Sequence, residues 1–174
     1  MLVVGGITVG AFQRSVLADS PKEYQVKAAF LYHFVQFAEW PKQAFSDPGM
    51  RIRICVYGDD PFAGYLVKTF MGKSLHSRQF IVQPRVSALD IESCHVLFMN
   101  RQIDVSQQEV QRALQRSQAL TVGESEDFLK FGGMIQFYRV ENNIRFAVNS
   151  DVLDQKDLHL SSKLLRLARI VKSK

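Results

Sequence analysis

Short apolar runs of strand length alternate along this chain with segments of helical period. Apolar runs bounded by turn residues predict strands at 51–58, 78–84, 95–99 and 118–123. Between them, one helix is predicted after Asp60 and another over 106–116. Parallel strands need a long crossover, which a helix supplies. The alternation therefore predicts an α/β fold in one domain, with a mostly parallel, Rossmann-like sheet and helices on both faces.

The two ends of the folded region depart from this alternation. Ser20 and Pro21 are typical N-cap and first-turn residues, and they predict a helix that continues through an aromatic-rich segment to Trp40. Two strand-like segments flank Asn142-Asn143 and predict a C-terminal antiparallel hairpin with a tight asparagine turn. Leucines at helical spacing predict a closing helix from about Leu158.

The first eighteen residues have the pattern of an export signal. An apolar run over 2–12 is followed by Val16 and Ala18, which fit the small-residue positions before a cleavage site. We therefore expect residues 1–18 to be a signal peptide that is removed, and residues 19–174 to form the domain. No Lys or Arg precedes the run, which indicates that the true start lies upstream. The run is shorter than the roughly 20 apolar residues of a membrane span, and a buried first strand is the alternative.

The net charge of +5 comes from basic residues scattered along the chain, and the densest group, of five cations, lies at the C-terminus. These cations are Lys163, Arg166, Arg169, Lys172 and Lys174. On the predicted closing helix they are expected to form a solvated face that favours the negative end of the helix dipole. No basic run is interleaved with aromatic residues as a nucleic-acid surface requires, so we expect no nucleic-acid partner.

The turns after the predicted strands do not favour a cofactor or a metal. The turn over 58–61 has no glycine-rich phosphate cradle, and its Asp59 and Asp60 would repel the phosphates of a dinucleotide. An acidic pair here resembles the metal site of receiver domains, but strand 95–99 runs into Asn100 rather than the aspartate that accepts phosphate. A receiver-like binding module remains an alternative. The four histidines lie far apart, and no metal site is expected.

The chain contains two cysteines, Cys55 and Cys94. An exported protein reaches an oxidising compartment, where two cysteines usually pair. A disulfide between them would contribute about 3–4 kcal/mol in the chain-entropy model. Two buried thiols are the alternative.

The stretch "TVGESEDFLKFGGMIQF" at 121–137 places a serine where some hydrolases carry a nucleophile. Asp127 stands where the nucleophile elbow has its second glycine, and acids beside Ser125 disfavour an oxyanion. A helix that begins with Ser125 as N-cap and ends at Gly132-Gly133 explains the pattern structurally. The aromatic, methionine and acidic side chains of the stretch suit a protein contact. The helix-and-cap explanation and a binding surface both remain open for this stretch, and we expect no enzyme.

Five motifs in this order resemble the YfiR family of periplasmic regulators, over nearly the whole mature sequence. They are "EYQVKAAFLYHFVQFAEWP" at 23–41, "ICVYGDDPF" at 54–62, "TVGESEDFLKFGGMIQF" at 121–137, "NNIRFAVN" at 142–149 and "LSSKLLRLARIV" at 160–171. The resemblance implies an exported α/β domain without catalytic activity or cofactor. It also implies a partner, the periplasmic part of an inner-membrane diguanylate cyclase, which the bound regulator holds inactive. Cyclic di-GMP and biofilm formation would fall as a result.

The resemblance carries specific roles to this chain. It implies a disulfide between Cys55 and Cys94, and it is compatible with a homodimer. It assigns partner contact to residues of the 121–137 stretch, namely Glu124, Ser125, Phe128, Gly132, Gly133 and Met134. The rival interpretation is a periplasmic small-ligand binding module without a cyclase partner. Its support is the aromatic-rich first helix, with Phe30, Tyr32, Phe34, Phe37 and Trp40.

Overall fold

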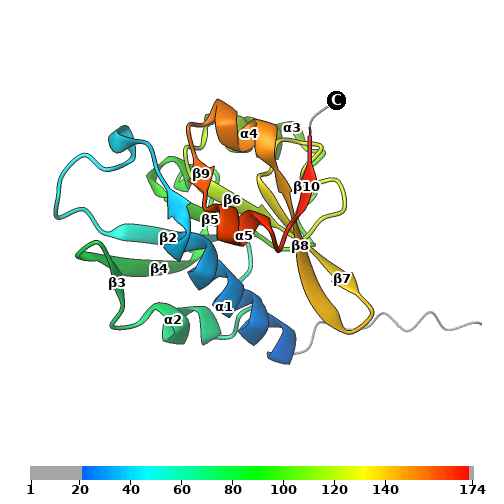
Figure 1. Ribbon diagram of the computed structural model, residues 1–174, viewed down its shortest axis with the longest axis horizontal. Coiled ribbons are helices and arrows are strands. Elements are labelled where there is room, and N and C mark those ends of the chain that lie inside the picture. The colour runs from blue at the N-terminus through cyan, green and yellow to red at the C-terminus, as the bar shows by residue number, and fades with distance from the viewer. Residues whose placement is uncertain (1–20, 173–174) are drawn as a thin grey trace, which may run out of the picture.

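A computed structural model of the chain describes residues 21–172 (Figure 1). Eight strands form one sheet in the order β10-β8-β7-β6-β5-β2-β4-β3. Helices lie against this sheet, which confirms a mixed α/β chain with a mostly parallel sheet. The predicted signal peptide at 1–18 lies outside the described residues.

Parallel pairing joins the middle of the sheet, from β4 through β2, β5 and β6 to β7. The predicted strands correspond to β2 (Ile52–Tyr57), β4 (Arg78–Val86), β5 (Val96–Met99) and β6 (Leu120–Gly123). Two crossovers carry the predicted helices α2 (Tyr65–Phe70) and α3 (Gln108–Arg116). Short elements complete the connections: β3 (Ser74–Leu75) pairs antiparallel with β4, and 3-10 turns lie at Lys42–Ala44 and Ile91–Ser93.

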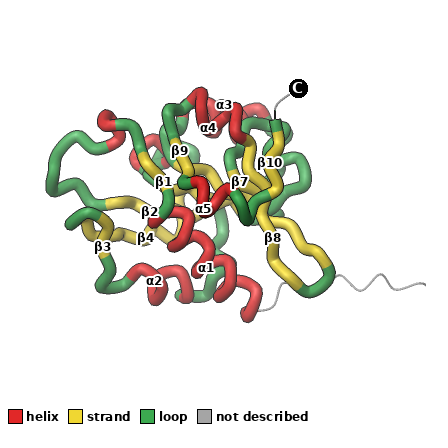
Figure 2. Tube along the Cα trace, in the orientation of Figure 1, coloured by secondary structure: helices red, strands yellow, loops and turns green. Residues whose placement is uncertain are grey.

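The sheet buries a hydrophobic layer on each face. In β5, Val96 and Phe98 point into the layer beneath helix α1 (Pro21–Gln36), while Leu97 and Met99 point into the layer beneath α3. This alternation follows from the two-residue side-chain period of a strand, and both faces must be apolar because helices cover both. Figure 2 shows α1 and α5 (Ser162–Leu165) crossing one face of the sheet.

The predicted hairpin is formed by β7 (Ile135–Val140) and β8 (Asn143–Asn149), which pair antiparallel. Its two-residue turn is Glu141-Asn142, one position earlier than predicted, because Asn143 already pairs with Val140. Glu141 adopts a left-handed φ of 53°. The hairpin projects past the neighbouring strands at the lower right of Figure 1.

The long closing helix predicted from Leu158 is wrong. That segment forms β9 (His159–Leu160), the one-turn helix α5 and the edge strand β10 (Arg169–Val171). The Ser161 hydroxyl caps α5 by accepting the Leu164 N–H, and β10 then pairs parallel with β8. Pairing gives the backbone groups of β8 partners that a helix could not provide, so tertiary context overrides the helical spacing of the leucines.

The first helix is also shorter than predicted, because α1 ends at Gln36. The chain then forms β1 (Ala38–Glu39), which pairs antiparallel with β9, and the Ser161 N–H donates to the Phe37 carbonyl at 2.9 Å. These contacts join the two ends of the described chain. The remaining helix, α4 (Ser150–Gln155), begins where the Asn149 side chain accepts the Val152 N–H at 3.3 Å.

Cys55 and Cys94 form a disulfide, as expected, with their α-carbons 6.0 Å apart. Cys55 lies in β2, and Cys94 comes just before the adjacent strand β5, which pairs parallel with β2. The bond therefore fixes the entrance of β5 beside β2. Within residues 21–172, no helix is long and apolar enough to cross a membrane.

Replacing both cysteines, as Cys55→Ser with Cys94→Ser, should lower the free energy of unfolding by about 3–4 kcal/mol, because the unfolded chain regains the entropy that the crosslink removes. Urea denaturation followed by circular dichroism measures the change. Reduced and alkylated wild-type protein serves as the control and should unfold at nearly the same urea concentration as the variant. A variant as stable as the oxidised protein would contradict this role.

Candidate functional site

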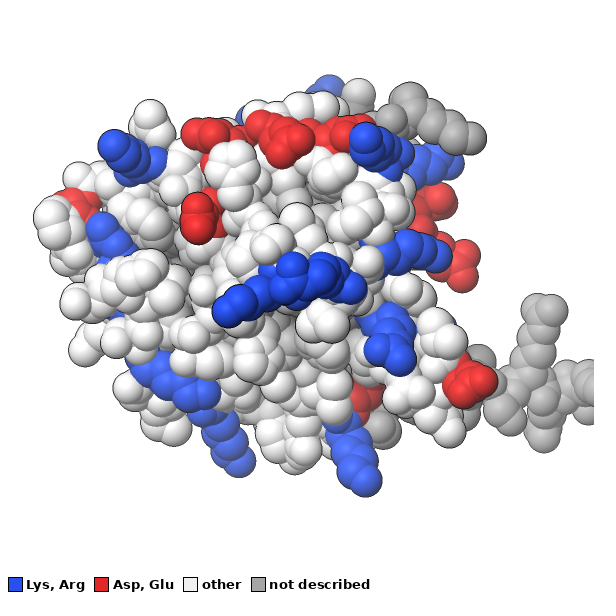
Figure 3. Space-filling view, in the orientation of Figure 1, with Lys and Arg blue, Asp and Glu red and all other residues white. Residues whose placement is uncertain are grey.

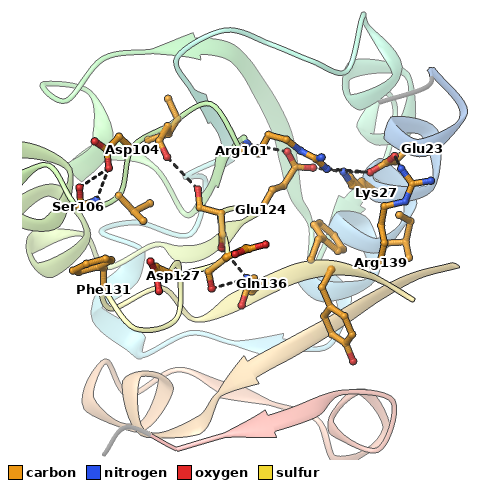
Figure 4. Close-up of a pocket in the computed structure, with 17 residues that line it drawn as sticks. Glu23, Lys27, Arg101, Asp104, Ser106, Glu124, Asp127, Phe131, Gln136 and Arg139 are labelled. Atoms are coloured by element: carbon orange, nitrogen blue, oxygen red, sulfur yellow. Dashed lines mark hydrogen bonds and ion pairs between the residues drawn. The ribbon is translucent and has the colours of Figure 1, made fainter. Parts of the chain in front are cut away.

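A cleft of about 620 Å³ opens at the carboxyl ends of β5 and β6 (Figure 4). In α/β sheets, ligands usually bind at this edge. The lining residues come from α1, the two segments that follow β5 and β6, and the hairpin. They are Glu23, Lys27, Arg101, Ile103, Asp104, Val105, Ser106, Glu124, Ser125, Glu126, Asp127, Phe131, Gln136, Phe137, Tyr138, Arg139 and Ile144.

The register of the sheet explains why a cleft forms here. Gly123, the last residue of β6, pairs with Gln136, which is only the second residue of β7. The rest of β7 therefore extends beyond the end of β6 and forms one wall. The segment after β5 forms the opposite wall, and the first turns of α1 close one end (Figure 4).

Three buried charged side chains form the floor at the α1 end of the cleft. Lys27 contacts Glu23 on its own helix and Glu124 at the end of β6, and these side chains are only 1–4% exposed. Glu124 Oε2 also accepts the Tyr24 hydroxyl and the Arg101 backbone N–H, both at 3.1 Å. Buried charges are tolerated when they are paired and hydrogen-bonded, and this network provides both conditions.

Two partly exposed arginines lie between this buried floor and the solvent. Arg139 Nη1 lies 3.1 Å from Glu23 Oε2, and Arg101 Nη2 lies 3.6 Å from Glu23 Oε1. Their side chains are 36% and 45% exposed, so both guanidinium groups reach solvent as well as the floor. Because a guanidinium carries five donors, each arginine can hold Glu23 and still present N–H groups to a partner carboxylate.

The segment that follows β6 is a turn held by side-chain hydrogen bonds. The Gln136 amide donates to the Ser125 and Glu126 carbonyls at 2.8 and 3.0 Å. The Ser125 hydroxyl donates to the Ile103 carbonyl at 3.1 Å, and no histidine is among the residues that line the cleft. Ser125 thus joins this turn to the segment that follows β5. The predicted helix after it is wrong, because residues 126–132 form successive turns, and Ser125 caps no helix.

The ring of Phe128 explains why glycine occupies positions 123 and 133. Its ring is fully buried and lies between Gly123 and Gly133, with opposite edges toward the two residues. A Cβ atom would lie 2.3 Å from the ring at Gly123 and 2.2 Å at Gly133. No side chain fits at either position. Gly132 has a left-handed φ of 94°, which returns the chain toward β7.

The six residues predicted for partner contact lie together but at different depths. Ser125 and Gly132 are partly exposed, and Glu124 forms part of the cleft floor. The other three, Phe128, Gly133 and Met134, are buried beneath the surface. A partner can therefore reach Ser125 and Gly132 directly, while the buried members set the shape of the turn. Their assignment to partner contact stays a prediction.

Sequence reasoning missed Lys27, the central cation of the floor. The sequence does contain an indication that Lys27 is buried, because it shares the apolar helical face that carries Tyr24, Ala28 and Leu31. A lysine at such a position indicates a buried partner of opposite charge. The two arginine partners of Glu23, Arg101 and Arg139, come from segments far along the chain.

A second cleft, of about 750 Å³, lies at the amino ends of the strands beside the disulfide, and His95 is one of its residues. His95 Nδ1 accepts the Arg53 N–H at 3.1 Å, and its ring stacks on Phe45. Burial lowers the pKa of His95, and Arg53 and Arg78 lower it further. These contacts hold a neutral imidazole against the loop that contains Phe45, which is a structural role.

These observations define a mixed α/β protein with a mostly parallel sheet, a polar cleft at the carboxyl edge of that sheet and a buried ionic floor. Residues 24–169, most of the chain, match the YfiR/HmsC-like family. The chain belongs to the YfiR/HmsC-like family, which confirms the resemblance seen in its motifs. A search of curated proteins found no match.

Gly133→Ala should lower the free energy of unfolding by about 3 kcal/mol, because its methyl group would overlap the Phe128 ring. Chemical denaturation measures the change. Adding Phe128→Leu should make the double variant less unstable than the sum of the two single losses. Gly49→Ala is the matched control, since its nearest neighbour is a mobile Asp47 oxygen at 3.3 Å. Full stability of Gly133→Ala would contradict the packing.

Lys27→Met should cost about 3–5 kcal/mol of stability, because it leaves the Glu124 carboxylate buried beside Glu23 without its cation. Adding Glu124→Gln should recover part of the loss, as a double-mutant cycle by urea unfolding would show. Lys22→Met, at an exposed position of the same helix, is the control and should change stability by less than about 0.5 kcal/mol. Equal effects at Lys22 and Lys27 would show that the buried network is not required.

Proposed function

We propose that this chain is an exported regulator that binds the periplasmic part of an inner-membrane diguanylate cyclase and holds the enzyme inactive. Membership in the YfiR/HmsC-like family is the observation that carries the proposal. Lower cyclic di-GMP and reduced biofilm formation follow from an inactive cyclase. The protein acts by binding, and no catalytic step or cofactor is assigned to it.

The Cys55–Cys94 disulfide supports the periplasm as the compartment. Disulfides form and persist in oxidising compartments and are rare where thiols are kept reduced. The predicted signal peptide at 1–18 would deliver the chain there, and domain 19–174 would be the mature protein. A homodimer is a further proposal, drawn from the family resemblance.

We assign partner contact to the cleft and to the turn made by Glu124, Ser125, Phe128, Gly132, Gly133 and Met134. The exposed rim combines arginine, acidic and aromatic side chains, which is a composition that protein interfaces favour. The buried floor and the Phe128 packing keep the rim in one shape. A preorganised surface loses less conformational freedom on binding.

Inhibition then requires a difference in affinity. If the regulator binds the inactive form of the cyclase more tightly than the active form, binding shifts the equilibrium toward inactivity. A difference of about 1–3 kcal/mol gives the 5- to 150-fold effect typical of allosteric coupling. A surface contact at the sensor segment is sufficient, and no contact with the catalytic domain is needed.

The rival function is a periplasmic small-ligand binding module. A cleft of about 620 Å³ falls in the size range of ligand sites, which favours this alternative. The aromatic residues of the first helix do not add to it. Phe34 is fully buried and packs against Phe137 and Phe146, while Phe30 and Tyr32 pack against the same core.

Cells that lack this chain should contain more cyclic di-GMP than cells that carry it, because the cyclase is released. Expression of the wild-type chain should restore the low level. Asp127→Arg, at a rim position with a 60% exposed side chain, should restore it only in part, because the reversed charge weakens docking. Mass spectrometry of nucleotide extracts measures the level, and immunoblots confirm equal amounts of protein.

Asp154→Arg is the matched control, since it makes the same charge change at an exposed position of α4 outside the cleft. It should restore the low level fully. An unchanged cyclic di-GMP level in cells without the chain would overturn the proposed function. Full restoration by Asp127→Arg would leave the function standing and overturn the rim as its site.

A further inference from the structure

A patch of cations lies along the last two elements of the described chain, α5 and β10. Its charged members are Lys163 of α5, Arg166 just after that helix, Arg169 of β10 and Lys172, and all four are exposed. Figure 3 shows a band of Lys and Arg across the middle of the face that carries α5. Within residues 21–172, no acidic side chain forms an ion pair with Lys163, Arg166 or Lys172.

Two exposed apolar side chains lie among these cations. Leu167 is 69% exposed and Ile170 is 45% exposed. Leu164 points into the core, so Lys163 beside it in α5 points toward solvent. We call the set Lys163, Arg166, Leu167, Arg169, Ile170 and Lys172 the α5–β10 patch.

The patch residues lie outside the lining of the two clefts described above. None of its members lines the cleft at the carboxyl ends of the strands or the cleft beside the disulfide. One of its cations contacts an aromatic ring, since the Arg169 guanidinium lies 4.5 Å from the centre of the Tyr138 ring. Neither catalysis nor core packing accounts for four cations around protruding apolar groups.

We propose that the α5–β10 patch binds the surface of a membrane that contains anionic phospholipids. Cations that flank exposed leucine and isoleucine match the two layers of such a surface, with phosphates outside and acyl chains just beneath. Leu167 protrudes from the protein surface, so its side chain can reach the acyl layer beneath the lipid phosphates.

The expected binding is weak and electrostatic. Each Lys or Arg near an anionic membrane strengthens binding by about fivefold, so four cations give reversible attachment rather than stable insertion. Salt should release the protein, because the screening length falls to roughly 3 Å at 1 M ionic strength. Attachment would concentrate the protein at a membrane surface, and the inference does not depend on any particular protein partner.

Flotation of the purified domain, residues 19–174, with lipid vesicles tests the proposal without any cyclase. One set of vesicles contains equal parts phosphatidylglycerol and phosphatidylcholine, and the other contains phosphatidylcholine alone. The wild-type domain should float with the anionic vesicles at low salt and not with the neutral ones. Lys163→Glu with Arg166→Glu should reduce the bound fraction at least tenfold, and Leu167→Ser should reduce it about threefold.

Lys22→Glu with Lys68→Glu is the matched control, because it makes the same charge change at exposed positions elsewhere. It should keep most of the binding. Equal loss in this control would show that net charge alone drives attachment and would overturn the patch. Absence of wild-type binding to anionic vesicles would also overturn the proposal. In that case, the patch would be a protein contact if the Lys163→Glu, Arg166→Glu variant bound an acidic protein domain more weakly than the wild-type domain does.

Discussion

The buried contact between Lys27 and Glu124 is the interaction on which the rest of the site depends. It joins the first helix to the end of β6, two elements nearly 100 positions apart in sequence. Removing two charges from water is costly, and the cost is offset only when both ions are well paired and hydrogen-bonded. Glu23, Tyr24 and the Arg101 backbone supply the additional partners. The same network places Arg101 and Arg139 at the mouth of the cleft.

A second constraint shapes the opposite side of the site. Phe128 fills the space that side chains at Gly123 and Gly133 would occupy, so the turn closes tightly over its own ring. The glycines and the phenylalanine of this stretch therefore meet a packing requirement. Ser125 and Gln136 complete the turn with hydrogen bonds to neighbouring backbone groups. The surface proposed for docking is rigid for these reasons.

The central elements of the fold were predictable because each carries a local signal. The four parallel strands are short apolar runs bounded by turns, and the hairpin has a polar two-residue turn. The disulfide followed from two cysteines and an export signal. The C-terminal segment was not predictable in the same way. Its leucines have helical spacing, but pairing of β10 with β8 decides its structure, and that pairing is a long-range effect.

The site itself was predicted only in part. Its location in the 121–137 stretch followed from the motif, and Glu124 and Ser125 do line the cleft. The burial of Phe128 was not foreseen, because sequence spacing does not show that two glycines lie against one ring. Lys27 was missed because its charge is balanced by a residue from a different element. Burial and ion pairing of this kind depend on tertiary contacts.

The most direct test of regulation by binding uses purified components. The oxidised domain 19–174 is titrated into the cyclase, reconstituted in membranes, while binding and the rate of cyclic di-GMP synthesis are recorded together. The account predicts saturable binding and a fall in the synthesis rate with the same concentration dependence. Binding without any change in the rate, or a constant rate without binding, would contradict it.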